Sequence, residues 1–247
     1  MAIARFAVPA LVAGLVVLGS AQTACADGMK PDKSIVIVST DPKHPTKMTV
    51  TNTGGTEDLL LVDILPIDED TADIVRVSPA SGTSSVKPDG TQQVTFTAVE
   101  QVQDETKQRL RRVVFEGAKG TPSRTTKRNE VGVSVRQNLP LIIHPSKLPL
   151  EREPWKRLQW VEHNGELTVK NDSPYVVRLS QEFESLPSKT VMGLSRSYVL
   201  PGARLTMKRP ARAAHDTEVR IHPATVYGYQ TDHFEAPITA EKVTGEK

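Results

Sequence analysis

Six histidines, one cysteine and a short acidic run are the residues of this chain that could support metal or acid–base chemistry. The histidines never show the His-Glu-x-x-His spacing of a zinc hydrolase; they are His44, His144, His163, His215, His222 and His233. A single cysteine, Cys25, excludes both a thiolate-rich zinc site and an intramolecular disulfide. The acidic run Asp68–Asp70 could hold a cation, but we expect a solvated loop there.

Nucleophilic and phosphate-binding motifs are equally weak. The segment Gly193–Ser197 lacks the second glycine of a nucleophile elbow, and no glycine-rich loop has the spacing that cradles a phosphate. We therefore predict no catalytic residue, no metal site and no cofactor, and we expect a protein that is not an enzyme.

The composition favours β-structure in two domains. The 247 residues are 38% hydrophobic and 4% aromatic, and a length of this order suits two domains of about 100–150 residues. Lysine and arginine number 31 against 29 acidic residues, so no concentrated positive charge points to a nucleic-acid ligand.

Residues 1–26 have the pattern of a secretory signal peptide. Arg5 supplies the positive start, residues 6–18 are mostly apolar, and Ala24-Cys25-Ala26 places small residues at the expected cleavage site. Gln22 stands where a lipoprotein signal needs an aliphatic residue, so we expect Cys25 to leave with the signal. No later apolar run approaches 18 residues, so we predict export to the periplasm without a membrane span.

Short strand patterns separated by turn residues continue through the chain, and none has the apolar spacing of a long helix. Residues 100–109 could form one helical turn at most. In the first half we predict strands at 34–38, 47–52, 59–65, 74–77, 94–97, 110–116 and 131–143. In the second half we predict strands at 158–161, 166–171, 175–180, 199–200, 205–207, 218–221 and 225–229.

The strand at 131–143 alternates more regularly than the others. Its odd positions place Val131, Val133, Val135 and Leu139 on one face, interrupted only by Gln137. Such a row fits a core strand of this protein's own sandwich, and it also fits a strand that is lent to another protein. The alternation alone does not separate these two interpretations.

Residues 144–154 contain three prolines and predict a stiff connection between two β-sandwiches. We place the first domain at residues 27–147 and the second at 148–247. The expected fold is all-β, with two immunoglobulin-like sandwiches joined by this proline-rich bend.

The order and spacing of several segments resemble the periplasmic chaperones of the chaperone–usher pathway, which assemble pili and fimbriae. Residues 112–119 resemble the family's F strand, and the polar loop at 120–129 leads to an alternating strand that ends at Pro145. Residues 169–177 resemble the strand–turn–strand signature of the second domain, and residues 200–203 fit the Pro-Gly turn that follows. The likeness is greatest to the atypical, longer-loop branches of the family.

The resemblance implies a mechanism called donor-strand complementation. Pilus subunits lack a final strand, and the chaperone supplies its own until the subunit reaches the outer-membrane usher. Val131, Val133, Val135 and Leu139 would then form the donor strand, although we expect Leu139 also to contact the chaperone's own core. Exposed valines could let the free protein self-associate.

This sequence departs from the family at the residues that clamp the subunit's C-terminal carboxylate. The family uses an arginine in its first strand and a lysine near the end of the G strand. Here the first strand has no arginine, and Pro140 falls at the lysine position, where it also removes a backbone donor. Arg136, Arg112 and Lys33 are the candidate replacements, with ordinary solvated charges as the alternative.

Two other kinds of protein remain as alternatives. A secreted two-domain structural or adhesive surface protein would also consist of two such sandwiches, but residues 27–33 are too short and polar for a pilin's donor extension. A secreted hydrolase would need a catalytic constellation that the sequence lacks.

Overall fold

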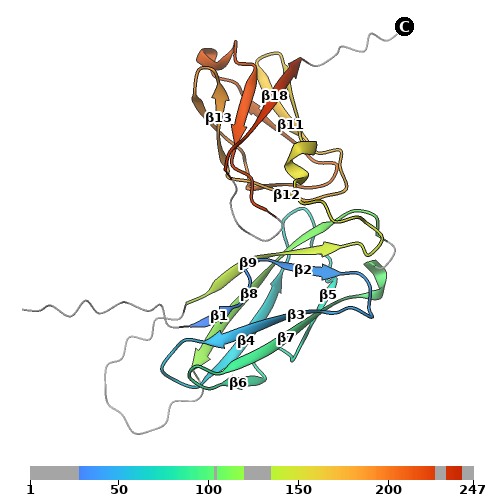
Figure 1. Cartoon of the computed structure of the whole chain (residues 1–247), viewed down its shortest axis with the longest axis vertical. Coiled ribbons are helices and arrows are strands. Elements are labelled where there is room, and N and C mark those ends of the chain that lie inside the picture. Colours follow the sequence, from blue (N-terminus) through green and yellow to red (C-terminus); the bar gives the residue numbers. More distant parts are fainter. Residues whose placement is uncertain (1–27, 103–104, 120–134, 226–231, 241–247) are drawn as a thin grey trace, which may run out of the picture.

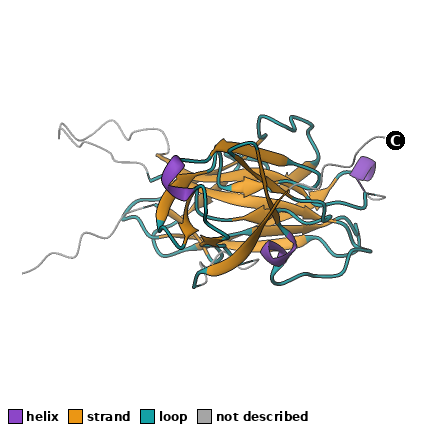
Figure 2. Ribbon diagram, turned by 90° about the horizontal axis from the view of Figure 1, so that it is seen from above, coloured by secondary structure: helices purple, strands orange, loops and turns teal. Residues whose placement is uncertain are grey.

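The computed structural model of the chain describes residues 28–102, 105–119, 135–225 and 232–240. The predicted signal peptide, residues 1–26, lies outside these ranges. Figure 1 shows two β-sandwich domains, one above the other, and Figure 2 shows that strands and loops make up nearly all of the ribbon. Within the described ranges, the helices are short 3-10 turns, namely η1 (Glu100–Val102), η2 (Pro154–Arg157) and η3 (Ala211–Ala213). The prediction of an all-β fold is confirmed.

The first domain packs two sheets against each other. One sheet has the strand order β1 (Met29–Pro31), β3 (Thr46–Asn52), β7 (Thr91–Ala98) and β5 (Val75–Ser78). The other has the order β2 (Val36–Ser39), β9 (Gln137–His144), β8 (Arg109–Lys119), β4 (Asp58–Leu65) and β6 (Ser84–Val86). The N-terminal segment thus changes sheets, because β1 pairs with β3 while β2 pairs in parallel with β9.

In the second domain a C-terminal strand joins the two layers. One layer consists of β10 (Gln159–His163), β11 (Glu166–Lys170) and β16 (Arg204–Lys208), and the other of β14 (Thr190–Gly193), β13 (Glu182–Leu186) and β17 (Glu218–Ile221). Strand β18 (Phe234–Ala240) pairs with β17 along its first half and with β10 along its second. A separate pair, β12 (Val177–Arg178) and β15 (Tyr198–Val199), lies at the end that faces the first domain.

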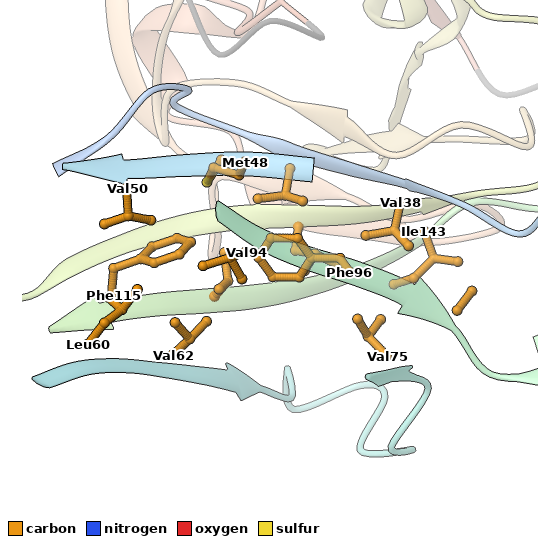
Figure 3. Close-up of a cluster of buried hydrophobic side chains, with 14 of the residues drawn as sticks. Val38, Met48, Val50, Leu60, Val62, Val75, Val94, Phe96, Phe115 and Ile143 are labelled. Atoms are coloured by element: carbon orange, nitrogen blue, oxygen red, sulfur yellow. The ribbon is translucent and has the colours of Figure 1, made fainter. Parts of the chain in front are cut away.

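Each domain has its own hydrophobic core. In the first, Phe96 and Phe115 meet edge to face with ring centroids 6.4 Å apart, surrounded by the aliphatic side chains of Figure 3. In the second, the ring centroids of Trp160 and Phe183 lie 5.0 Å apart in the core between the layers. The first core draws on residues 29–143 and the second on residues 155–236. The boundary between residues 147 and 148 stays a prediction.

Most of the strands expected from the sequence are present within a few residues of their predicted bounds, and η1 lies in the segment that allowed one helical turn. The sequence patterns miss five strands: β1, β6, β13, β14 and β18. β1 and β6 have three residues each and few apolar side chains, while Pro237 interrupts the pattern of β18. The predicted strand at 225–229 falls mostly outside the described residues, and that at 175–180 shortens to β12.

Candidate binding strand and domain junction

Strand β9 is paired on both edges at its end and on one edge at its beginning. It runs antiparallel to β8 from Gln137 to Ile143, whereas its parallel pairing with β2 starts only at Leu141. Among the described residues, positions 137–140 therefore pair with β8 alone. Pro140 lies at the last of these positions, opposite Arg112. A residue without an N–H group suits such an edge, because no donor is lost from a second ladder.

The odd positions of this segment face the interior of the first domain. Leu141 and Ile143 are fully buried in its core, and Leu139 packs against that core while remaining partly exposed. Leu139 thus contacts the protein's own core, as expected. Just before β9, Val135 is half-buried and forms an isolated parallel bridge with Gly28. Val131 and Val133, the first two residues of the predicted donor row, lie outside the described residues.

Gly28 lies close to Val135, so that a larger side chain at position 28 would be crowded. A Cβ atom added to Gly28 would lie 3.1 Å from the Cβ of Val135, closer than ordinary van der Waals contact. The beginning of the first domain thus meets the predicted donor row at Val135, the one valine of that row within the described residues.

The three candidate anchors lie apart. On β8, Arg112 donates from Nε to Oδ1 of Asn138 at 2.7 Å. Arg136 is largely exposed and forms an ion pair with Glu116, whose carboxylate lies 3.6 Å away. Glu116 follows Arg112 by four residues on β8. The ammonium group of Lys33 donates to the carbonyl of Lys47 at 2.9 Å, in an exposed loop. The structure does not bring these three side chains to one place.

A fourth arginine, which the sequence analysis did not single out, lies on β12, at the end of the second domain that faces the first. Arg178 of β12 has its Nη1 atom buried without a hydrogen bond. Burial, and then the positive charge of Arg112, lower the pKa of the Arg178 guanidinium from its ordinary value. It stays protonated at neutral pH, because the guanidinium group does not lose its proton in proteins. The alternation of residues 175–180 was the available signal, but it did not reveal which face meets the first domain.

An apolar cluster connects the two domains beside these arginines. Leu110 and Ile142 of the first domain pack with Val176 of the second, and partly buried Tyr198 and Leu200 border them. This cluster uses the outer face of β8 and β9, while the inner face fills the core of the first domain.

Gln108 adds hydrogen bonds between the domains. Its backbone N–H donates to the carbonyl of Pro174, and its side-chain oxygen accepts from the N–H of Val176, each at 2.8 Å. Its amide nitrogen lies 2.8 Å from Nδ1 of His144, whose Nε2 lies 3.0 Å from the carbonyl of Leu148. With Nε2 donating to that carbonyl, Nδ1 of a neutral His144 accepts from Gln108. Burial lowers the pKa of His144, against a smaller opposing effect of the Leu148 carbonyl.

The acidic run is not the solvated loop that the sequence suggested. Asp70 accepts two hydrogen bonds of 2.6 Å from Arg109 and one of 2.6 Å from the fully buried Arg111. Glu69 accepts from the hydroxyl of Tyr198 at 2.9 Å and pairs with Arg196. Two of its three carboxylates are therefore bound to arginines, because the fold brings the loop against β8 and against the second domain.

No cluster of three or more histidine, cysteine or acidic side chains gathers as a metal site within the described residues. In the same part of the chain, no helix has the length and apolar character needed to cross a membrane.

Comparison with known proteins assigns the family. Residues 153–235 match the family model of the pili assembly chaperone PapD, C-terminal domain. The chain is 34% identical over 209 residues to the uncharacterized fimbrial chaperone YhcA of Escherichia coli K12, covering 85% of this chain and 90% of the relative.

Solved structures share the fold over nearly the whole length. The E. coli chaperone DraB matches with a TM-score of 0.63 at 16% identity, over 86% of this chain and 97% of DraB. The structure of the Salmonella enterica SafA pilin with the SafB chaperone matches with a TM-score of 0.64 at 17% identity, over 85% of this chain and 95% of the matched one. With a relative of this identity and coverage, the chain belongs to the family of fimbrial (pili assembly) chaperones.

Proposed function

We propose that this protein is a periplasmic chaperone that binds fimbrial subunits through the strand segment from Val131 to Leu139 and delivers them to the outer-membrane usher. The observation that carries the proposal is the one-sided pairing of β9, since residues 137–140 have β8 on one edge and no described strand on the other. A subunit strand can add to such an edge through backbone hydrogen bonds.

The side chains of the donor row would supply the binding energy. The sequence alternation predicts that Val131, Val133 and Val135 share a face with Leu139, which packs against the chaperone's own core. Burying one valine contributes about 1.5–3 kcal/mol, so three contribute roughly 4–9 kcal/mol before ordering costs. An energy of that size holds a subunit and still lets another subunit's strand displace the chaperone.

Among the candidate anchors for the subunit's carboxylate, Arg112 has the best support. It lies on the outer face of β8 beside the domain junction and opposite Pro140 of the donor strand. Arg136 already pairs with Glu116, and Lys33 lies in an exposed loop with its ammonium group on a carbonyl oxygen.

The periplasmic location is supported by the predicted signal peptide at residues 1–26 and by the family. Pilus chaperones are not enzymes, and no reaction is proposed for this chain.

Co-expression of the protein with the subunits of a neighbouring usher operon, followed by mass spectrometry of the proteins that co-purify, tests the function. The wild-type protein is expected to retain a fimbrial subunit, and Val133→Asp is expected to lose it while remaining folded. Val191→Asp is the matched control, because Val191 is 57% exposed on β14 of the second domain. Equal capture by both variants would overturn the donor-strand assignment.

A further inference from the structure

The N-terminal segment of the first domain contacts the predicted donor strand at two places. Gly28 forms a parallel bridge with Val135. The parallel pairing of β2 with β9 then begins at Val36 and Leu141. Between these contacts the N-terminal segment advances eight residues, from 28 to 36, while the donor strand advances six, from 135 to 141. The longer segment arches away from β9, and its strand β1 pairs with β3 of the opposite sheet instead.

Gly28 is held in place by residues other than Val135. Its N–H donates to the hydroxyl of Thr53 at 3.2 Å. Its carbonyl accepts from the same hydroxyl at 2.9 Å and from the N–H of Thr53 at 3.0 Å. The next residue, Met29, is fully buried in the core of the first domain. Thr53 and Met29 therefore fix Gly28 at the position from which it meets Val135.

The contact covers the edge of the donor strand that faces away from β8. At the neighbouring position, Arg136 forms its ion pair with Glu116 of β8, so β8 continues along the opposite edge. A Cβ atom on Gly28 would lie 3.4 Å from the carbonyl oxygen of Val135 and 3.8 Å from its Cα, so the two backbones are in contact. Covering a strand edge with another segment prevents the edge from pairing with unrelated chains.

The same contact conflicts with the binding of a subunit. A strand that adds to a sheet bonds to the backbone groups along one edge. At Val135 the edge away from β8 already has Gly28 as its bridge partner, whereas positions 137–140 have no described strand on that edge. Gly28 and a subunit strand cannot occupy the edge at Val135 together.

We propose that Gly28 caps the free edge of the donor strand at Val135 in the unbound protein, and that an incoming subunit strand displaces it. The proposal rests on the proposed function, which supplies the subunit. The hydrogen bonds between Thr53 and Gly28 oppose the displacement, so they slow capture and protect the edge until a subunit arrives.

A disulfide between positions 28 and 135 tests whether the cap must open. Cβ atoms at these positions would lie 3.1 Å apart, slightly less than the ~3.5–4.5 Å of a disulfide. The native cysteine, Cys25, lies in the predicted signal peptide. The assay dilutes the urea-unfolded fimbrial subunit, identified by co-purification, into the purified free protein. The double variant Gly28→Cys/Val135→Cys is expected to lose capture when oxidised and to regain it when reduced.

Thermal unfolding separates this loss from misfolding. The oxidised double variant should melt at or above the temperature of its reduced form, because a disulfide constrains the unfolded chain. A folded protein that captures no subunit until its disulfide is reduced has a cap that must open.

Replacing Thr53 loosens the cap without altering the donor strand. Thr53→Val removes the hydroxyl that is bonded to Gly28 and keeps the shape of the side chain. Because the cap then loses side-chain hydrogen bonds, capture of the urea-unfolded subunit should be about three to ten times faster than with wild type. Thr53→Ser keeps the hydroxyl and is the matched control, for which we expect the wild-type rate.

Equal capture by the oxidised and reduced forms of the double variant overturns the proposal, and so does capture by Thr53→Val at the wild-type rate. In both cases the wild-type protein still binds the subunit, so the proposed function stands. Failure of the wild-type protein to capture any subunit instead contradicts the proposed function itself.

Discussion

Arg111 is a fully buried cation inside the first domain, and its neutralisation depends on Asp70. Arg111 also donates to the backbone carbonyls of Ala72 and Leu110, so the guanidinium group connects β8 to the loop that contains Asp70. Partial burial alone would raise the pKa of the Asp70 carboxyl, but the hydrogen bonds from Arg109 and Arg111 outweigh burial and hold that pKa well below its usual range.

Replacing Asp70 by alanine should therefore destabilise the first domain strongly. It leaves the charge of Arg111 buried and unpaired, which costs about 3 kcal/mol, near the low end for a broken buried pair because Asp70 keeps some exposure. Asp73→Ala is the control, since Asp73 and Arg76 form a largely exposed ion pair nearby. Urea unfolding measures both variants, and equal losses of stability would contradict this role of Asp70.

At the scale of elements, the same pattern of hydrogen bonds surrounds a buried asparagine in each domain. Asn52 ends β3, and Asn171 follows β11; each is fully buried. Each side chain donates to the carbonyl four residues on and to a second distant carbonyl, and accepts from the N–H two residues on. The backbone of each asparagine also hydrogen-bonds to a turn that precedes the partner strand: the turn before β7 for Asn52 and the turn before β16 for Asn171. Asp89 in the first turn and Gly202 in the second have positive φ.

Asn171→Ala should cost the second domain about 3 kcal/mol or more. Two carbonyls and one N–H lose their partners in a buried place, and each unsatisfied group costs about 1–3 kcal/mol. The exposed neighbour gives the control variant Asp172→Ala, for which we expect little change. The free energy of unfolding of the two variants is the measurement, and a small loss for Asn171→Ala would show that water or rearrangement replaces these bonds.

The sequence predicts strands well where apolar residues alternate, as in β3, β7 and β8, because alternation is what a half-buried strand imposes. It misses β13, where Glu182 and Glu184 separate the buried residues, and it misses the hydrogen-bond pattern of the buried asparagine in the first domain. Both depend on contacts with strands distant in the chain. The negative charge of Glu184 is balanced by Arg220 on β17, whose Nη1 lies 2.9 Å from the Glu184 carboxylate.

The candidate site was predictable only in part. The alternating row and the proline at its end are visible in the sequence, and so are the three candidate anchors, which the fold separates. The position of Arg178 at the domain junction was not predictable, because it depends on which face of the second domain meets β8. No periodicity within one domain carries that information.

At the scale of the whole molecule, the junction combines the apolar cluster around Ile142 and Val176, the hydrogen bonds of Gln108, and the contacts of Glu69 with Tyr198 and Arg196. A proton on His144 would oppose one of these elements. Nδ1 would become a donor facing the amide nitrogen of Gln108, whose oxygen is already held by the N–H of Val176.

Stability should therefore fall as the pH drops below 6.5, the ordinary pKa of histidine. Because burial lowers the folded-state pKa of His144, the unfolded chain binds the proton more readily, and the contribution of neutral His144 is lost as pH falls through that lowered pKa. Unfolding measured from pH 7.5 to 5 should show a shallower dependence for His144→Asn than for wild type. His233→Asn, at an exposed position, should follow wild type; if both variants do so, His144 is not the sensor.

The central claim is that the strand segment through Val135 contacts the subunit, and site-specific photo-cross-linking tests it most directly. A photoreactive residue at position 135 should form a covalent adduct with the co-expressed subunit, because that half-buried position lies in the donor row. The same residue at the exposed position 191 of the second domain should form none. Adducts from position 191, with none from position 135, would contradict the account.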